Sequence, residues 1–496
     1  MSSTDTLRTL IGEVMDLRHA ADLIEWDERV YMPPGGVTVH GEMSAALRRL
    51  AHEKFTSGEV GDALDAARRG VASEDADSTA ARMVRVVERD YARATRVPAD
   101  FVAEHAAAIS AAQHTWAEAR ANSDFARFAP HLQKVIDLKQ RYVAFFPPAD
   151  HPYDVLLDDY EPGMKTADVR RLFDSLRQRQ VAIIKSVAAK PAPQADFLTT
   201  AYAESDIRRF AEDVVTAFGF DWTRGRQDKS VHPFATGIGA HDVRITTRWV
   251  EGQPLALLFG TMHEAGHAMY EQGVGDEHQR TILEGGASLG VHESQSRLWE
   301  NMVGRSRQFW DHFFPRLQAT CPAQLGGVTA GAFHAAINRV QPTLIRVEAD
   351  EATYNLHIML RVELELALIE GSLRVPDLPE AWNTKMREYL GLTPPSDATG
   401  VLQDIHWSAG LFGYFATYTL GNVIGAQLWE RFGAVHAERD SEIGRGEFAP
   451  LLSWLRTELH RHGRKFDPKE LVERITGSAV DSEPYLRYLE TKYSAQ

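Results

Sequence analysis

The stretch Leu255-Ala-Leu-Leu-Phe-Gly-Thr-Met-His-Glu-Ala-Gly-His-Ala-Met-Tyr270 contains the spacing H-E-x-x-H. Residues four apart lie on one face of an α-helix, so His263 and His267 can offer imidazole nitrogens to one metal ion. Glu264 can direct its carboxylate at a water molecule on that ion. Two neutral nitrogens bind Zn²⁺ without cancelling its charge, and the carboxylate can remove the proton of the bound water. The stretch therefore predicts a helix with a hydrolytic metal site and Glu264 as its catalytic base.

The alternative interpretation of this stretch is a solvated amphipathic helix with two ordinary histidines. The segment from Leu255 to Met262 is almost wholly apolar, which indicates a buried helix. Buried histidine and glutamate side chains need partners. The sequence therefore favours the metal site.

A third ligand has to come from elsewhere in the chain, because two histidines leave a metal ion under-coordinated. Glu271 lies near the same helix face as His267 but cannot readily fold back onto the metal beside both histidines. Glu284 precedes two glycines in a predicted loop, whereas Glu293 opens a second predicted helix, and a carboxylate on a helix is held more rigidly. We favour Glu293 over Glu284, with His292 third. The downstream residues considered are Glu271, Glu277, His278, Glu284, His292 and Glu293.

Length and composition are those of a large globular protein. The chain has 496 residues, 44% hydrophobic and 25% charged, and a net charge of −15, which disfavours nucleic acid and anionic membranes as partners. Its single cysteine, Cys321, excludes an intrachain disulfide and fits a reducing compartment. There is no basic region followed by an apolar run at the N-terminus and no apolar window of about 18 residues, so we expect neither a signal peptide nor a membrane span. The simplest location is the cytoplasm.

Most of the chain has the composition and periodicity of helices. We expect helices at about 3–26, 41–56, 77–93, 100–120, 125–145, 166–189, 205–218, 291–302, 344–370 and 382–390. The stretch 151–163 has no clear period and is predicted to be a loop, either a plain surface loop or one facing substrate. The clearest strand signal is 242–250, where Val243, Ile245 and Thr247 alternate on one side. This strand could form the edge of an active-site cleft and pair with an extended peptide.

Six short motifs follow one another along the chain. They are His232-Pro-Phe234, Asp242-Val-Arg-Ile-Thr246, His263-Glu-Ala-Gly-His267, His292-Glu-Ser-Gln295, Ile345-Arg-Val-Glu-Ala-Asp350 and Gly400-Val-Leu-Gln-Asp-Ile-His-Trp407. By these motifs the chain resembles the M32 family of metallocarboxypeptidases, the carboxypeptidase Taq type, over nearly its whole length. We see no departure from the family pattern at a motif position.

The resemblance implies a mainly α-helical metallopeptidase fold with a deep active-site groove and a small β-sheet next to the H-E-x-x-H helix. It implies His263, His267 and Glu293 as metal ligands and Glu264 as the catalytic carboxylate. It also implies one divalent ion per subunit, Zn²⁺ or Co²⁺, a homodimer and a cytoplasmic location. We expect a single peptidase domain over residues 1–496, with a helical N-terminal part to about 200 and a catalytic part from about 201.

The predicted reaction is the removal of single C-terminal residues from peptides with a free C-terminus, by attack of a metal-bound water. Arginine binds a carboxylate best through a bidentate pair, so Arg346 and Arg244 are candidates for the substrate carboxylate, with a structural salt bridge as the alternative role. His232 is assigned to substrate binding by the resemblance alone, and Tyr414 or His406 could assist the oxyanion. Four further residues are expected to orient these groups or to pack: Asp242, Asp350, Gln403 and Asp404.

Other functions fit the sequence less well. A zinc endo-oligopeptidase or dipeptidyl carboxypeptidase on a similar helical fold would carry the same metal site and differ only in its cleft. A non-catalytic binding protein would be expected to lack Glu264 or a ligand, and neither is missing. A metal-storage bundle would repeat Glu-x-x-His pairs on several helices, and the sequence has no such set.

Overall fold

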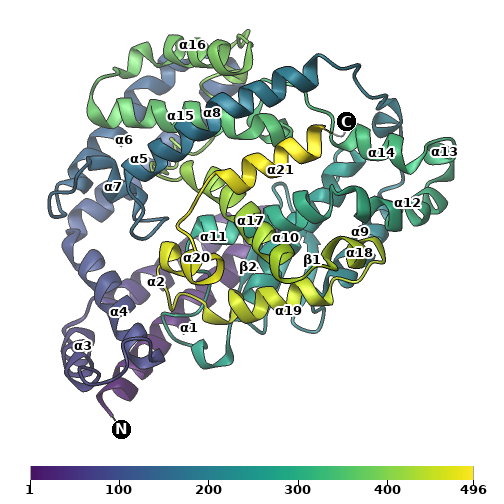
Figure 1. Cartoon of the computed structure of the whole chain (residues 1–496). Helices are drawn as coiled ribbons and strands as arrows, with labels where there is room; N and C mark the ends of the chain where they lie inside the picture. Colours follow the sequence, from purple (N-terminus) through teal and green to yellow (C-terminus); the bar gives the residue numbers. More distant parts are fainter. Residues whose placement is uncertain (1, 495–496) are drawn as a thin grey trace. The chain divides into compact units, whose positions relative to one another are not determined.

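The computed structural model describes residues 2–494, which form a mainly helical protein with one small sheet (Figure 1). The chain makes two compact units, each assembled from three separate stretches. The first unit contains Met1–Thr95, Gln194–Ile337 and Leu428–Ala479, and the second contains Arg96–Pro193, Asn338–Gln427 and Val480–Gln496. A mainly helical fold with a small sheet is as predicted, while the division of one peptidase domain near residue 200 stays a prediction.

The helices of the first unit include the segment that carries H-E-x-x-H. They are α1 (Ser3–Val30), α2 (Val37–Phe55), α3 (Gly58–Gly70), α4 (Thr79–Arg96), α9 (Glu204–Phe218), α10 (Pro254–Glu271), α11 (Leu289–Arg297), α12 (Arg307–Thr320), α13 (Pro322–Leu325), α14 (Ala330–Ile337), α18 (Arg439–Gly444), α19 (Ala449–Glu458) and α20 (Pro468–Thr476). A π-helical turn, Leu298–Val303, directly follows α11.

The second unit is helical throughout its described residues apart from its loops. Its helices are α5 (Ala99–Asn122), α6 (Phe125–Val143), α7 (Pro152–Leu157), α8 (Thr166–Ala188), α15 (Glu351–Glu370), α16 (Leu378–Leu390) and α21 (Glu483–Ser494), with most of α17 (Ala416–Val435). No helix in the part of the chain that the structure describes is both long enough and apolar enough to cross a membrane.

Local side-chain chemistry fixes several helix starts. The Ser2 side chain accepts from the backbone N–H of Asp5, and the Asp5 carboxylate accepts from that of Ser2, so a capping box opens α1. The helix predicted from 344 begins only at Glu351, because the Asp350 carboxylate caps the N–H groups of Ala352 and Thr353. The boundary prediction was wrong there by seven residues.

The stretch predicted as a loop at 151–163 contains the short helix α7. His151 accepts from the backbone N–H of Tyr153, and Pro152 occupies the first helical position, where its missing N–H costs nothing. Tyr153 to Leu157 are all buried. The acidic and aromatic character that indicated a surface loop belongs in part to a buried helix.

The sheet has three strands, β1 (Gly225–Lys229), β2 (Ala235–Gly237) and β3 (Val243–Thr247), in the order β1-β3-β2. β3 pairs in parallel with β1 and antiparallel with β2. The strand predicted as an edge is therefore the central one, and its backbone is already paired on both sides. That expectation was wrong, because neither neighbour carries a strand signal: β1 reads Gly-Arg-Gln-Asp-Lys, and its pairing is set by tertiary contacts.

Candidate metal centre

The H-E-x-x-H motif lies on α10, which packs against α9, α11 and β3. Proline at the first helical position starts the helix, and an apolar run carries it into the core of the first unit. His263 and His267 lie one turn apart on the same face, with ring centroids separated by 4.9 Å. Their side chains keep 19% and 17% of their surface exposed in a helix that is otherwise largely buried. The helix thus presents both imidazoles at a single accessible position.

Gly266 allows α11 to approach the motif closely. A Cβ atom at this position would lie 2.6 Å from the carbonyl oxygen of Gln295 and 2.7 Å from the Cα of Ser296. Both atoms belong to the backbone of α11 and cannot rotate away. Only glycine fits here, so α11 can pack against α10 (Figure 1). The close contact brings Glu293, on α11, to the histidines.

Three ligand atoms converge between these helices. The Nε2 atoms of His263 and His267 lie 3.5 and 3.3 Å from Oε2 of Glu293. The candidate donor atoms all fall within 4.8 Å of one another, and no other such group of three occurs among residues 2–494. Two imidazole nitrogens and one carboxylate oxygen match the three-ligand set of catalytic zinc sites, which keep a further position open. The residues present therefore fit a divalent cation.

The charges around the cluster also favour a positive charge between the two histidines and Glu293. Burial disfavours the charged form of His263, but the charge of Glu293 and a hydrogen bond with Glu300 outweigh burial and raise its pKa to about 9. Burial is the largest influence on His267 and lowers its pKa to about 4, so this imidazole is neutral. Burial opposes the ionisation of Glu293, yet Arg297 and His263 hold its pKa well below its usual range. A bound cation would supply the charge that a proton on His263 otherwise provides.

Glu264 lies beside this cluster with 7% of its surface exposed. Burial raises the pKa of its carboxyl to about 7; His263 opposes the rise, and the charges of Glu293 and Glu300 add to it. A carboxyl with a pKa near neutrality can take up a proton and give it back at the pH of a cell. The role of Glu264 as the catalytic base stays a prediction.

Glu300, on the π-helical turn, contacts the candidate ligand His263 and was not among the residues considered from the sequence. Its Oε2 lies 2.9 Å from Nδ1 of His263, and it is also paired with Arg297 and Arg305. Arg297 in turn donates to Oε1 of Glu293 at 2.7 Å, so one guanidinium bridges both carboxylates. Burial opposes the ionisation of Glu300, but His263 and Arg297 lower its pKa to about 2. The spacing 293, 297, 300 puts these residues on one helical face and was a readable signal.

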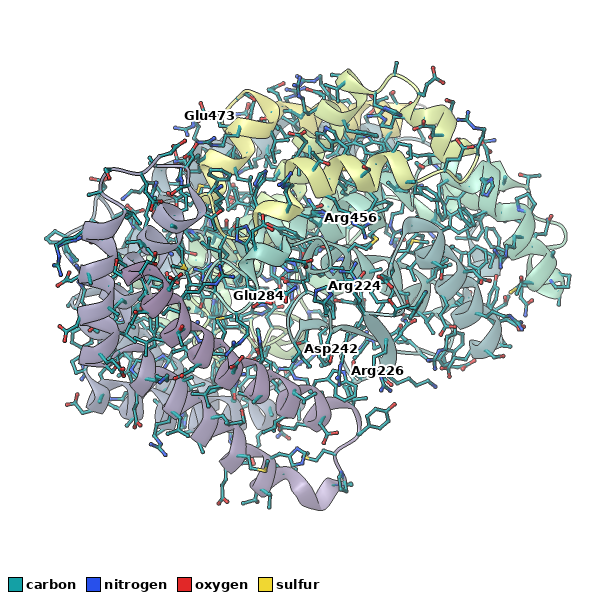
Figure 2. All side chains as sticks on the ribbon, turned by 90° about the horizontal axis from the view of Figure 1, so that it is seen from below. Arg224, Arg226, Asp242, Glu284, Arg456 and Glu473 are labelled. Atoms are coloured by element: carbon teal, nitrogen blue, oxygen red, sulfur yellow. The ribbon has the colours of Figure 1, made fainter. Side chains whose placement is uncertain are left out.

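The other candidates for the third ligand have different partners. Glu284, labelled in Figure 2, accepts from the backbone N–H of Arg280, and its Oε2 lies 3.9 Å from Nε2 of His19. It is not one of the three residues whose ligand atoms converge. His292 turns Nδ1 toward His267 and Nε2 toward Glu271, so neither nitrogen faces Glu293. The structure thus brings together the preferred three residues and neither alternative.

Arg244, a candidate for the substrate carboxylate, lies on β3 of the first unit. Its Nε and one terminal nitrogen donate to the two oxygens of Asp242 at 2.8 and 2.7 Å. Its guanidinium also lies 4.3 Å from the Trp26 ring centroid, which Arg226 of β1 contacts as well. Figure 2 labels Arg226 and Asp242. His232 is exposed before β2. Arg244 is therefore held by a carboxylate and an aromatic ring, as the salt-bridge alternative supposed.

Arg346, the other candidate, belongs to a buried ion cluster in the second unit. It donates from Nε and Nη2 to Oδ1 of Asp404 at 3.0 and 2.8 Å, and from Nη1 to the Tyr354 hydroxyl. Arg361, fully buried, donates to the other oxygen of Asp404 at 2.7 Å. Gln403 accepts from the Arg346 backbone N–H and from the Arg361 guanidinium. The donors of Arg346 are thus engaged, and its side chain is only 7% exposed.

The remaining predicted residues of the second unit have packing or capping contacts. Asp350 caps α15 and also accepts from the backbone N–H of Gln341. His406 shares a hydrogen bond with the Tyr418 hydroxyl at 3.1 Å, and its ring lies 5.4 Å from that of Tyr414. Burial, followed by the charge of Arg346, lowers the pKa of His406 to about 3, so the imidazole is neutral.

The chain is similar to known proteins over nearly its whole length. The family model described as carboxypeptidase Taq (M32) metallopeptidase matches residues 6–493. The chain is 44% identical to thermostable carboxypeptidase 1 of Thermus thermophilus over 95% of its own length and 94% of the relative's, and 35% identical to carboxypeptidase 1 of Bacillus subtilis over 98% and 97%. Its structure is similar to the crystal structure of the M32 carboxypeptidase from Deinococcus radiodurans, with a TM-score of 0.96, 42% identity and 99% of both chains covered.

Proposed function

Because the chain belongs to the carboxypeptidase Taq (M32) family of metallopeptidases, it is a metal-dependent carboxypeptidase, and we propose that it removes single residues from the C-terminus of peptides. The observation that carries the proposal is the convergence of His263, His267 and Glu293 beside the buried carboxyl of Glu264. A metal-dependent hydrolase uses a metal ion to polarise the substrate and generate the nucleophile from a bound water, and a carboxylate beside the ion can take up the proton.

We propose that His263, His267 and Glu293 hold one Zn²⁺ ion per subunit, with Co²⁺ as the alternative. Two imidazoles and one carboxylate leave a position open for water and substrate, which supports this choice. When bound, the ion would polarise the scissile carbonyl and lower the pKa of a water molecule. Arg297 holds the second oxygen of Glu293, so that only Oε2 faces the histidines.

In this mechanism Glu264 acts first as a general base and then as a general acid. Its carboxylate takes a proton from the attacking water and then passes it to the nitrogen of the departing residue. The change Glu264→Gln preserves shape but removes the base, so we expect unchanged zinc content and a loss of turnover of about 10²–10⁴-fold. Glu277→Gln, on the exposed loop after α10, serves as control. Full activity of Glu264→Gln with zinc bound would refute the assignment.

Product analysis distinguishes the proposal from an endo-oligopeptidase or a dipeptidyl carboxypeptidase. A synthetic peptide should lose one C-terminal residue at a time in mass spectra, and its C-terminally amidated twin should resist cleavage. Internal cuts, loss of dipeptides or equal cleavage of the amide would refute single-residue removal.

Recognition of the substrate carboxylate is proposed for Arg244 or Arg346, with His232, Tyr414 and His406 as further contacts, on the strength of the family resemblance. Arg244 is the more exposed of the two guanidinium groups, at 16% against 7% for Arg346. Of its nitrogens, Nε and Nη2 bind Asp242, which favours Nη1 for an incoming carboxylate.

We also propose a cytoplasmic homodimer. Helix α2 offers a surface for the second copy, because Val39, Met43 and Leu50 follow one another at helical spacing and are 56%, 48% and 44% exposed. An exposed apolar stripe of this kind is typical of an interface. The one cysteine is buried and free, which accords with a reducing compartment.

A further inference from the structure

The outer nitrogen of His267 makes an unusual contact for an imidazole whose other nitrogen faces a candidate metal position. Its Nε2 is directed at Glu293, and its Nδ1 lies 2.6 Å from Nδ1 of His292. His292 Nε2 lies 2.7 Å from Oε1 of Glu271. Three side chains therefore form a chain of hydrogen bonds that ends at the candidate ligand His267.

The direction of the hydrogen bonds in this chain follows from the donor inventory. An ionised carboxylate only accepts, so Nε2 of His292 must carry the proton that Glu271 receives. With His292 as a neutral imidazole, which has one donor and one acceptor, Nδ1 of His292 accepts and the proton between the rings belongs to Nδ1 of His267. His267 is then left with a free lone pair on Nε2, the nitrogen that faces Glu293.

The other histidine is supported differently. Nδ1 of His263 lies 2.9 Å from the Glu300 carboxylate, which Arg297 and Arg305 also contact. This is a direct carboxylate–histidine pair of the kind common behind metal ligands. For His267 the carboxylate of Glu271 acts through the imidazole of His292. The orientation of His267 therefore depends on the ring of His292 being fixed.

The ring of His292 is held in place by its surroundings. The Tyr270 ring lies 5.2 Å from it, and the Tyr270 hydroxyl accepts from the backbone N–H of Ala287. A Cβ atom on Gly286 would lie 2.7 Å from Cδ2 of His292, so the loop backbone closes over the imidazole edge. The ring therefore has a tyrosine against it and a glycine at its edge.

We propose that His292 and Glu271 are positioning residues that hold His267 in the tautomer whose Nε2 can bind a cation, and so set the cation affinity of the site. This rests on the proposed function in so far as His263, His267 and Glu293 are the ligands. Neither residue contacts substrate in this proposal. Partners of this kind are worth about 10–100-fold in metal affinity.

The test compares two substitutions of one residue. His292→Asn keeps an acceptor near the position of Nδ1, whereas His292→Leu keeps apolar bulk and removes the acceptor. The zinc dissociation constant of the apo-protein is measured by competition with a chelator, and the visible spectrum of the Co²⁺-loaded protein reports ligand geometry. We expect about 10–100-fold weaker zinc binding and an altered cobalt spectrum for His292→Leu, with most of the affinity restored in His292→Asn.

A second pair of variants keeps the test independent of position 292. Glu271→Leu should weaken zinc binding less than His292→Leu, and Glu277→Leu, on the exposed loop beyond α10, should leave it unchanged. Thermal unfolding of each apo-protein verifies that the variants are folded.

The possible outcomes separate this inference from the proposed function. Wild-type affinity in His292→Leu, or equal losses in His292→Leu and His292→Asn, would overturn the positioning role and leave the proposed function standing. Failure of the wild-type protein to bind zinc or cobalt would refute the proposed ligand set and this inference with it.

Discussion

Two glycines on the same helix should respond in opposite ways to the same substitution. Gly260 and Gly266 both lie within α10, and each loses backbone entropy that alanine would not. Around Gly260 no atom beyond the neighbouring residues and backbone of its own helix lies within 4 Å of the position that an alanine methyl group would take, so Gly260→Ala should stabilise the protein by about 0.5–1 kcal/mol through helix propensity. The same gain is available to Gly266→Ala only if α11 moves.

The cost at Gly266 follows from the contact distances. The new methyl would lie 2.6 Å from the Gln295 carbonyl oxygen, whereas ordinary contact begins at 3.4 Å. Overpacking of a tight interior costs about 1–3 kcal/mol, so the two variants should differ by about 1.5–4 kcal/mol in the free energy of unfolding. Separation of α10 from α11 also moves Glu293 away from the histidines, and a metal site tolerates only about ±0.2 Å in its ligand distances.

The assay measures the thermal midpoint of the apo-protein and its zinc dissociation constant. Gly260→Ala should raise the midpoint and leave zinc affinity unchanged, while Gly266→Ala should lower the midpoint and weaken zinc binding. A raised midpoint for both variants, or full zinc affinity in Gly266→Ala, would refute the idea that the close helix contact assembles the site.

Two further predictions concern the buried ion cluster and the dimer. Asp404→Asn leaves Arg346 and Arg361 without their shared carboxylate and should destabilise the protein at neutral pH by about 3–5 kcal/mol, as measured by thermal unfolding. Although burial opposes ionisation, Arg346 and Arg361 hold the pKa of Asp404 below its usual range. The ionised Asp404 therefore stabilises the folded protein above about pH 4, the pKa of an unfolded aspartate, and this contribution is lost as the pH falls. Asp404→Asn should abolish this part of the pH dependence of the free energy of unfolding. Met43→Glu on the exposed face of α2 should halve the mass seen by sedimentation, and an unchanged dimer would exclude this face as the interface.

The sequence predicted the parts of the site that depend on local periodicity. Helical spacing puts His263 and His267 on one face whatever surrounds them, and the preference for a helix-borne carboxylate selected Glu293. The role of Gly266 could not be read from the sequence, because it depends on which backbone passes over the helix. The ion pair of Arg346 with Asp404 likewise depends on a contact between residues that are 58 positions apart along the chain.

The sheet also shows which features of the fold can be predicted from the sequence and which cannot. β3 was readable because its alternation reflects one buried face, with Val243 and Ile245 fully buried. Its partner β1 is charged and was not readable, so the place of β3 at the centre could not be inferred. Sequence periodicity reports burial, whereas strand order depends on neighbours that need no periodicity of their own.

The third candidate ligand and the groups that support both histidines all come from one segment of the chain. One continuous stretch, α11 with its π-helical turn, supplies Glu293, Arg297 and Glu300, and thereby both the carboxylate facing the histidines and the support of His263. π-helical turns inside helices are frequent at functional sites, where they re-aim side chains. His267 is supported from the same helix through His292. Both histidines thus depend on α11. The close approach of α11 at Gly266 therefore positions Glu293, its partner Arg297, and the hydrogen bonds that Glu300 and His292 make to the Nδ1 atoms of the two histidines.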